Sequence, residues 1–223
     1  MAAAMIFTRP AAILFDMDGL LLDTERLIRD AMIAVMAERG HVMTVADYAA
    51  LIGLTEPATE KIMQQRFAGL DYAAMRDAVR HRIAIDWGER RPLKPGAAAL
   101  VAQVNALRIP AAVVTSTEQG LARAHLGHSG LHGSFIAIIG GDDVAYGKPH
   151  PEPYATAAAR LGIAPGAALA LEDSHNGVRS AHAAGVPVIM VPDLLPATPE
   201  IAQHLLAVAA DLDQVGRWLA AAG

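Results

Sequence analysis

Ala11-Ala12-Ile13-Leu14-Phe15-Asp16-Met17-Asp18-Gly19 is an apolar run that ends in two aspartates and a glycine. Such a run, bounded by a glycine turn, is typical of a buried strand of a parallel sheet. Ligands of open α/β sheets bind just beyond the carboxyl ends of the strands. The stretch therefore predicts that Asp16 and Asp18 lie at a reaction site, although surface aspartates that cap a turn fit the same residues. Two buried carboxylates this close are costly unless a cation or substrate compensates them.

The spacing of apolar residues changes along the chain. Between residues 24 and 91 it is helical, and after Pro92 short apolar strands alternate with helices. Alternating strands and helices favour a parallel sheet covered on both faces. In the first region we expect helices over 45–52, 56–68 and 71–87, after one that contains Leu27, Ala31, Ala34 and Val35. In the second we expect strands at 111–114, 135–139, 168–171 and 186–191, and helices at 96–107, 118–126, 151–161 and 176–184.

The order of these segments predicts an α/β fold with an insertion. The first strand precedes the all-helical region and the other strands follow it, so one sheet is interrupted. We expect a Rossmann-like, doubly wound parallel sheet formed by residues 1–23 and 92–223, with an inserted α-helical cap over 24–91. Because the insertion begins just after the acidic strand end, the cap is expected to cover the site as a lid. Its hinges are predicted near residues 22–24 and 89–92.

Polar residues follow the later strands as well. Thr115 comes directly after strand 111–114, Lys148 lies in the loop after strand 135–139, and Glu172 and Asp173 follow strand 168–171. Taken singly, these residues fit a strand-end hydroxyl, a turn lysine and a helix N-cap. In a parallel sheet, however, all of them meet Asp16 and Asp18 at one edge. The joint arrangement therefore favours a functional site.

The chemistry of this set points to a phosphoryl group. Carboxylate oxygens are hard ligands that suit Mg²⁺, and a lysine supplies a point positive charge. The backbone N–H groups around Asp18 and Gly19 are expected to point at an anion, with Gly19 allowing close approach. Phosphoryl transfer needs mainly positioning and charge neutralisation. One carboxylate can attack phosphorus, and a second can exchange protons with the alcohol and with water.

Four motifs resemble those of the haloacid dehalogenase superfamily. They are FDMDG at 15–19, VVTST at 113–117, GKPHPEPY at 147–154 and LEDSHNG at 171–177. In order and spacing the resemblance covers essentially the whole chain. It is closest to the phosphatase branch with a helical cap, which includes enzymes like β-phosphoglucomutase and phosphoglycolate phosphatase.

The resemblance implies a role for each matching residue. Asp16 would be the nucleophile and a Mg²⁺ ligand, and Asp18 the general acid and base, with its carbonyl on the metal. Asp173 would bind Mg²⁺ directly, and Glu172 directly or through water. The phosphoryl group would be held by Thr115 and Lys148, with the substrate-binding set completed by Gly19, Ser116 and Thr117.

The predicted activity is a Mg²⁺-dependent phosphatase that acts on small phosphomonoesters, such as sugar or polyol phosphates, through an aspartyl-phosphate. One alternative is a sugar phosphate mutase like β-phosphoglucomutase, which grips a second phosphate. In ungapped register its cap arginine falls on Glu56, a cap lysine on Ile52 and a core lysine on Glu118. The acids at two of these positions, Glu56 and Glu118, repel a phosphate, which favours hydrolysis. The second alternative is a non-catalytic binding protein with the same fold.

Composition limits the partners. The formal charge is −5, without the basic stripe of a nucleic-acid binder, and there is no cysteine. Every apolar run breaks at a charge, Gly or Pro, so we expect no membrane span and a cytoplasmic protein. We expect a monomer or homodimer that takes a small-molecule phosphate ester. Among the histidines, His125 is expected at the surface or in a capping role, whereas His150 and His175 are candidates to line the site.

Overall fold

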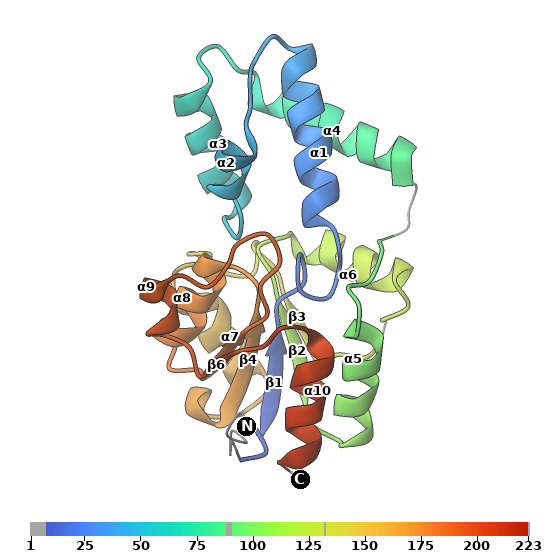
Figure 1. The fold of residues 1–223 in the computed structure, drawn as a ribbon, viewed down its shortest axis with the longest axis vertical. Coiled ribbons are helices and arrows are strands. Elements are labelled where there is room, and N and C mark those ends of the chain that lie inside the picture. Colours follow the sequence, from blue (N-terminus) through green and yellow to red (C-terminus); the bar gives the residue numbers. More distant parts are fainter. Residues whose placement is uncertain (1–7, 88–90, 132, 223) are drawn as a thin grey trace.

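The computed structural model describes residues 8–87, 91–131 and 133–222. Figure 1 shows a sheet wrapped by helices, with a separate group of helices beyond the carboxyl edge of the sheet. The strands form one sheet in the order β3-β2-β1-β4-β5-β6, and every neighbouring pair is parallel. The predicted doubly wound α/β fold is therefore confirmed. The strands are β1 (Ala12–Phe15), β2 (Ala111–Val114), β3 (Ala137–Ile139), β4 (Ala168–Glu172), β5 (Val188–Met190) and β6 (Ala207–Val208).

The central strand β1 is buried on both faces. Its side chains alternate, so Ile13 and Phe15 pack on one side of the sheet and Leu14 packs on the other. Phe15 is in register with Val113 of β2 and Leu171 of β4. This register brings the carboxyl ends of β1, β2 and β4 side by side.

Helices cover both faces of the sheet. The cluster around Phe15 includes apolar residues of α5, α6 and α10, and the cluster around Leu14 includes residues of α7, α8 and α9. Two faces covered in this way make the sheet a closed three-layer core. The bounds are α5 (Ala97–Ala106), α6 (Gln119–His128), α7 (Glu152–Arg160), α8 (His175–Ala183), α9 (Pro199–Ala202) and α10 (Leu212–Ala221), with a 3₁₀ turn η1 (Pro165–Ala167) before β4.

The region between β1 and α5 is helical, as its spacing predicted. It contains α1 (Glu25–Glu38), α2 (Val45–Ala49), α3 (Glu56–Arg66) and α4 (Tyr72–Trp87). These helices share a cluster of their own, with Met36, Met63 and Met75 fully buried in it. The division into a core and a cap at residues 23/24 and 91/92 stays a prediction, and residues 88–90 of the second predicted hinge lie outside the described residues.

The segments on either side of the helical region run next to each other. Leu22 and Leu93 form an antiparallel bridge. The Asp23 N–H donates to Pro92 O at 2.8 Å, and the Lys94 N–H donates to Leu21 O at 2.9 Å. Lys94 Nζ lies 2.7 Å from Asp193 Oδ1, which ties this paired segment to the loop after β5. The chain thus leaves the sheet core and returns to it at one place.

Element ends differ from the predictions by a few residues. The strand predicted at 135–139 begins at Ala137, because Ile136 is exposed and only 137–139 pair with β2. The strand predicted at 186–191 is reduced to 188–190, and α2 and α3 end earlier than expected. The short β6 and the helices α9 and α10 were not predicted. No helix in the described part of the chain is long and apolar enough to cross a membrane.

Candidate active site

The tip of β1 places Asp16 against a buried lysine. Lys148 Nζ donates to Asp16 Oδ1 at 2.6 Å, to Glu172 Oε1 at 2.5 Å and to Val114 O at 2.9 Å. These contacts use all three N–H groups of the ammonium. Burial alone would lower the pKa of Lys148, but the carboxylates of Asp16 and Glu172 outweigh it and raise the pKa. The lysine is therefore charged and holds Asp16 in a fixed orientation.

Glu172 is a second carboxylate that holds Lys148 in place. It is completely buried, and its Oε1 also accepts a hydrogen bond from the Tyr154 hydroxyl at 2.6 Å. Its Oε2 accepts from Ser174 Oγ at 3.1 Å. Gly177 lies so close that an added Cβ would stand 1.9 Å from the Glu172 carboxyl group. A side chain at position 177 would displace Glu172, so the LEDSHNG motif needs glycine at this position.

A group of acids beside Asp16 fits a divalent cation. Oxygen atoms of Asp16, Glu172 and Asp173 lie within 4.8 Å of one another, and all three residues are buried. Burial and mutual repulsion raise the pKa of Asp16 and of Asp173 well above the usual value. A hard cation would relieve this repulsion, and carboxylate oxygens are the ligands it prefers. The donor set therefore suits a metal such as Mg²⁺. Because Glu172 is already engaged by Lys148, Tyr154 and Ser174, Asp16 and Asp173 are the freer ligands.

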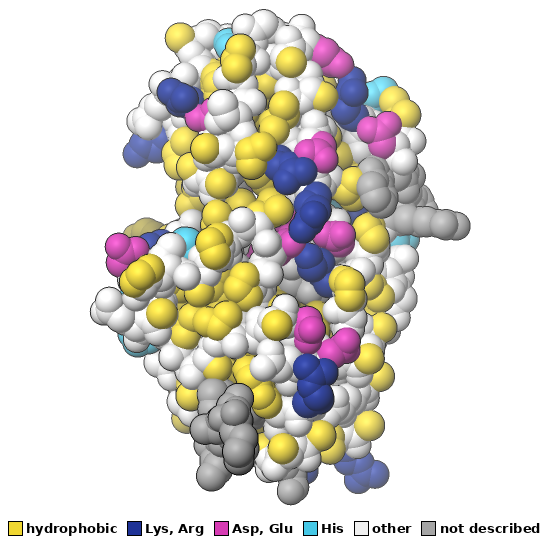
Figure 2. Space-filling model, viewed as in Figure 1, with side chains coloured by type: hydrophobic (Ala, Val, Ile, Leu, Met, Phe, Trp, Pro, Cys, Tyr) yellow, Lys and Arg dark blue, Asp and Glu magenta, His cyan; other side chains and the backbone are white. Residues whose placement is uncertain are grey.

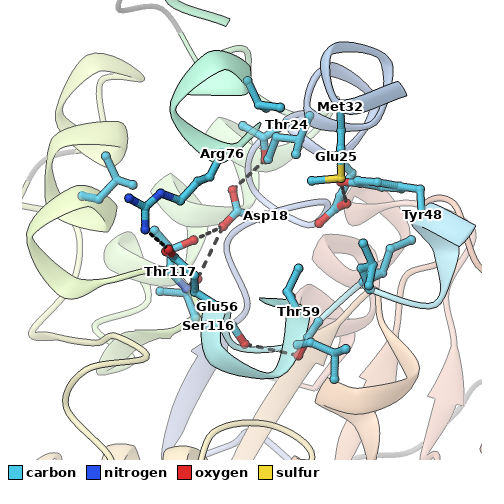
Figure 3. Close-up of a pocket in the computed structure, with 18 of the residues that line it drawn as sticks. Asp18, Thr24, Glu25, Met32, Tyr48, Glu56, Thr59, Arg76, Ser116 and Thr117 are labelled. Carbon is cyan, nitrogen blue, oxygen red and sulfur yellow. Dashed lines mark hydrogen bonds and ion pairs between the residues drawn. The ribbon is translucent and has the colours of Figure 1, made fainter. Parts of the chain in front are cut away.

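Asp18 lines the same cavity as Asp16 and is held by hydroxyl groups. Thr24 Oγ1 donates to Asp18 Oδ1 at 2.7 Å, and Thr117 Oγ1 donates to Asp18 Oδ2 at 2.8 Å. Figure 3 shows the Asp18 carboxyl group between these two threonines. Thr115 Oγ1 lies 3.5 Å from the same carboxylate and accepts from the Thr117 N–H. This second carboxyl group is thus oriented independently of the Asp16–Lys148 pair.

Gly19 differs from its prediction. Its N–H donates to Leu22 O at 2.8 Å, so it closes a turn and does not point at an anion. Gly19 has φ of +87°, and an added Cβ would lie 2.2 Å from Asp173 Oδ2. A left-handed backbone and the close approach of Asp173 both require glycine here. The close approach that the sequence predicted is therefore to a carboxylate of the chain itself.

A cavity of about 550 Å³ lies between the sheet edge and helices α1–α4. The predicted residues that line it are Asp16, Asp18, Thr115, Ser116, Thr117 and Asp173. Lys148, Glu172 and Gly19 are not among the described residues of the lining and lie behind this wall. The structure therefore brings the predicted residues together in two layers, one facing the cavity and one supporting it.

Several lining residues were not predicted. Glu25 and Tyr48 face the cavity as a buried pair, with the Tyr48 hydroxyl donating to Glu25 Oε2 at 2.6 Å. Burial raises the pKa of Glu25 to about 7. Arg76 of α4 pairs with Glu56, and His125 of α6 is half-buried in the wall. A surface or capping role was expected for His125, and the structure adds that it lines the cavity, because it lies one turn after Leu121 on the same side of α6.

The other two histidine candidates do not reach the cavity. His150 stacks on Tyr146, and His175 Nε2 lies 2.8 Å from Pro196 O. Neither is among the described lining residues, because the backbone turns both away from the strand ends.

Glu56 also differs from its expected effect. Arg76 and Arg80 both pair with it, Arg80 at 3.4 Å, so Glu56 does not present an uncompensated negative charge to a ligand. Glu56 therefore repels a second phosphate less than the sequence predicted.

The turn between α2 and α3 contacts the core directly. Ser116 Oγ donates to Gly53 O at 3.2 Å, and Asn176 Nδ2 donates to Ile52 O at 3.1 Å. Figure 1 shows this turn as the lowest point of the upper helices. Gly53 has φ of +74°, and an added Cβ would lie 2.8 Å from Ser174 Oγ. The contact depends on glycine for its backbone conformation and for space.

We expect Gly53→Ala to lower kcat/KM for phosphate release by about tenfold relative to Gly69→Ala. Both glycines have positive φ, +74° and +76°, so both variants carry the same backbone strain. An added Cβ at Gly69 meets nothing within 4 Å, whereas the one at Gly53 meets the core. An overpacked contact of this kind costs about 1–3 kcal/mol, and 1.4 kcal/mol is about tenfold. Equal kcat/KM values for the two variants would show that the contact between this turn and the sheet core does not contribute to catalysis.

Comparisons with known proteins agree with the fold and the motifs. A family model described as haloacid dehalogenase-like hydrolase matches residues 10–185. The chain is 34% identical over 194 residues to fructose-1-phosphate phosphatase YqaB of Escherichia coli, covering 83% of this chain and 98% of that protein. It is 32% identical over 221 residues to phosphoglycolate phosphatase of Rhodospirillum rubrum, covering 94% and 91%. The crystal structure of CbbY from Rhodobacter sphaeroides in complex with phosphate matches with a TM-score of 0.76 and 32% identity, covering 95% and 99%.

These matches extend over most of the chain and include the strand end that carries Asp16 and Asp18. They confirm the resemblance in the four motifs and the assignment to a hydrolase. The chain belongs to the haloacid dehalogenase-like hydrolase family.

Proposed function

We propose that the protein is a Mg²⁺-dependent phosphatase that hydrolyses small phosphomonoesters, with a sugar or polyol as the alcohol. The observation that carries the proposal is the buried Asp16, fixed by Lys148 at the tip of β1, with a second carboxyl group, Asp18, held by threonines in the same cavity. The names of relatives that are phosphatases support the same reaction class. The proposed partner is therefore a small phosphate ester.

In the first proposed step, a carboxylate oxygen of Asp16 attacks phosphorus. The bond between phosphorus and the ester oxygen breaks, and the alcohol leaves with a proton from Asp18. Thr24 and Thr117 hold Asp18 toward the leaving oxygen. Thr115 and Ser116 line the same wall, and their hydroxyl groups would donate to the phosphoryl oxygens, Ser116 in exchange for its bond to Gly53 O. The product of this step is an aspartyl-phosphate on Asp16.

In the second step, water attacks the aspartyl-phosphate and Asp18 takes the proton. Inorganic phosphate leaves, Asp16 returns as a carboxylate, and Asp18 is again protonated for the next cycle. Asp16 and Asp173 would hold Mg²⁺, with the Asp18 carbonyl, and Glu172 would serve mainly through Lys148. When bound, the metal supplies positive charge that offsets the charge of the phosphoryl oxygens.

The test is phosphate release from a broad panel of phosphomonoesters, measured with Mg²⁺ and after its removal by a chelator. We expect release from several sugar or polyol phosphates that is lost on chelation and restored by added Mg²⁺. No release from any ester with Mg²⁺ present would instead favour a binding protein that keeps the fold without the chemistry.

A mutase is the second candidate. The observation that favours it is that two arginines of the cavity wall, Arg76 and Arg80, share one acid of that wall, Glu56, which leaves this part of the wall with a net positive charge to attract a second phosphate. Incubation with β-glucose 1-phosphate and a sugar bisphosphate separates the two activities. Free phosphate supports the phosphatase, whereas an isomerised sugar phosphate with no free phosphate supports the mutase.

A further inference from the structure

The cavity is longer than a phosphoryl group requires. Helix α4 lines it with a stripe at helical spacing, from Tyr72 through Met75, Arg76, Val79 and Arg80 to Ile83. At 1.5 Å per residue this stripe is about 16 Å long. The cavity therefore extends along α4 toward its carboxyl end, as far as Ile83.

Helix α6 forms the facing wall of this extension. Leu121 and His125 lie one turn apart on the side of α6 that lines the cavity, and Glu118 precedes them. Leu121 is 39% exposed, an unusual state for a large apolar side chain in a cavity wall. We call the space bounded by Val79, Arg80 and Ile83 of α4 and by Leu121 and His125 of α6 the α4–α6 arm. It is continuous with Thr117, which contacts Asp18.

The polar groups of the arm offer little to a polyol. Arg80 is paired with Glu56, and burial lowers the pKa of His125, so its ring is neutral near pH 7. His125 Nδ1 is buried without a hydrogen-bond partner among the described residues. Within its described part, the arm thus offers a ligand one unpartnered polar atom, His125 Nδ1. A polyol with several hydroxyl groups would leave most of them without partners here, and an unsatisfied buried hydroxyl is costly.

An apolar ring suits the same space. Burying a ring against Ile83 of α4 and Leu121 of α6, which are partly exposed, removes apolar surface from water on both sides, whereas Val79 is already buried. The imidazole of His125 and the guanidinium of Arg80 offer flat faces on which a ring can stack. Figure 2 shows apolar side chains gathered between the upper helices and the sheet core on the near face, beside a band of charged residues; α4 and α6 lie farther back in this view.

We propose that the α4–α6 arm is a leaving-group subsite for a flat, largely apolar ring. The substrate class is then a phosphorylated sugar extended by such a ring, an aryl or nucleobase glycoside phosphate. Its phosphate lies at Asp16, its sugar beside Asp18, and its ring between α4 and α6. The inference rests on the proposed phosphatase function and names the substrate class of that same site.

The test compares substrates that differ only at the far end. Phenyl β-glucoside 6-phosphate is paired with methyl β-glucoside 6-phosphate, and uridine 5′-monophosphate with methyl β-ribofuranoside 5-phosphate. Within each pair the leaving oxygen is the same, so its reactivity is constant. We expect kcat/KM to be about tenfold higher, or more, for the ring-bearing member of at least one pair. Equal values in both pairs overturn the proposal.

Two variants locate the effect. Leu121→Ser and Ile83→Ser should each reduce the ring preference to about twofold or less, while kcat/KM for the methyl substrates stays within about twofold. Leu206→Ser and Ile85→Ser are matched controls, because both side chains are exposed, by 44% and 69%, and neither is among the described lining residues. The controls should keep the full preference.

The outcomes separate this inference from the proposed function. If the methyl substrates release phosphate and no ring preference exists, only the subsite fails. If no substrate releases phosphate with Mg²⁺, the phosphatase proposal fails with it. If Leu121→Ser lowers kcat/KM equally for both members of a pair, Leu121 serves to close the cap on the core, which also overturns the subsite.

Discussion

Replacing Asp16 with asparagine is expected to lower kcat for phosphate release by about 10⁴-fold or more. The amide has nearly the shape of the carboxylate and can still accept a hydrogen bond from Lys148, so the site keeps its geometry. It has no negative oxygen to attack phosphorus, so the covalent step is lost. One measurement is steady-state phosphate release. The other is detection of acid-stable phosphate bound to the protein, which should be present in the unsubstituted protein and absent in Asp16→Asn.

Asp30→Asn is the control for this variant, because Asp30 is an exposed carboxylate of α1 that pairs with Arg29 away from the cavity. It should keep kcat within about twofold. A rate for Asp16→Asn within tenfold of the unsubstituted protein would show that another group attacks phosphorus. The proposed roles of Asp18 and Lys148 depend on Asp16 as the nucleophile, so they would then be wrong as well.

The second large effect is on stability. We expect Lys148→Met to lower the free energy of unfolding by about 3–5 kcal/mol, the usual cost of removing one partner of a buried ion pair. Lys148 is 4% exposed and Glu172 is completely buried, so the methionine leaves Glu172 without its cation. Methionine fills nearly the same volume, which limits the contribution of a cavity. Denaturant unfolding followed by circular dichroism measures the change, with the slope compared as a check on the two-state transition.

Lys61→Met is the matched control, since Lys61 of α3 is exposed and should change stability by less than about 0.5 kcal/mol. A double variant, Lys148→Met with Glu172→Gln, should recover part of the loss because it removes the stranded charge. A loss below 1 kcal/mol in Lys148→Met would mean that the Lys148–Glu172 contact does not hold this site together.

The sequence predicted the parts of the fold that depend on short-range pattern. The apolar run before Asp16 and the alternation of strands and helices after Pro92 were enough for a doubly wound sheet. Because the carboxyl ends of parallel strands share an edge, the positions of Asp16, Thr115 and Asp173 in the chain also predicted their meeting in space. What these residues do stays a prediction that the experiments above address.

The cap side of the cavity could not be predicted in the same way. Apolar spacing identifies α4 as a helix, but not the rotation that turns Arg76 and Ile83 toward the core. The pair of Glu25 with Tyr48 joins α1 to α2, and such a contact depends on how two helices pack. Gly19 was recognised as a turn residue, whereas the partner of its N–H depended on the chain returning at Leu22.

The paired segments at Leu22 and Leu93 have a consequence for how such an enzyme can change over time. Because the chain departs and returns through neighbouring residues, lengthening the segment between these points costs little extra closure entropy, about 0.6 kcal/mol for each doubling of its length. Insertions at such sites are tolerated. Selection can therefore lengthen, rebuild or exchange the whole helical segment between these points while the strand ends that hold Asp16 and Asp173 keep their geometry.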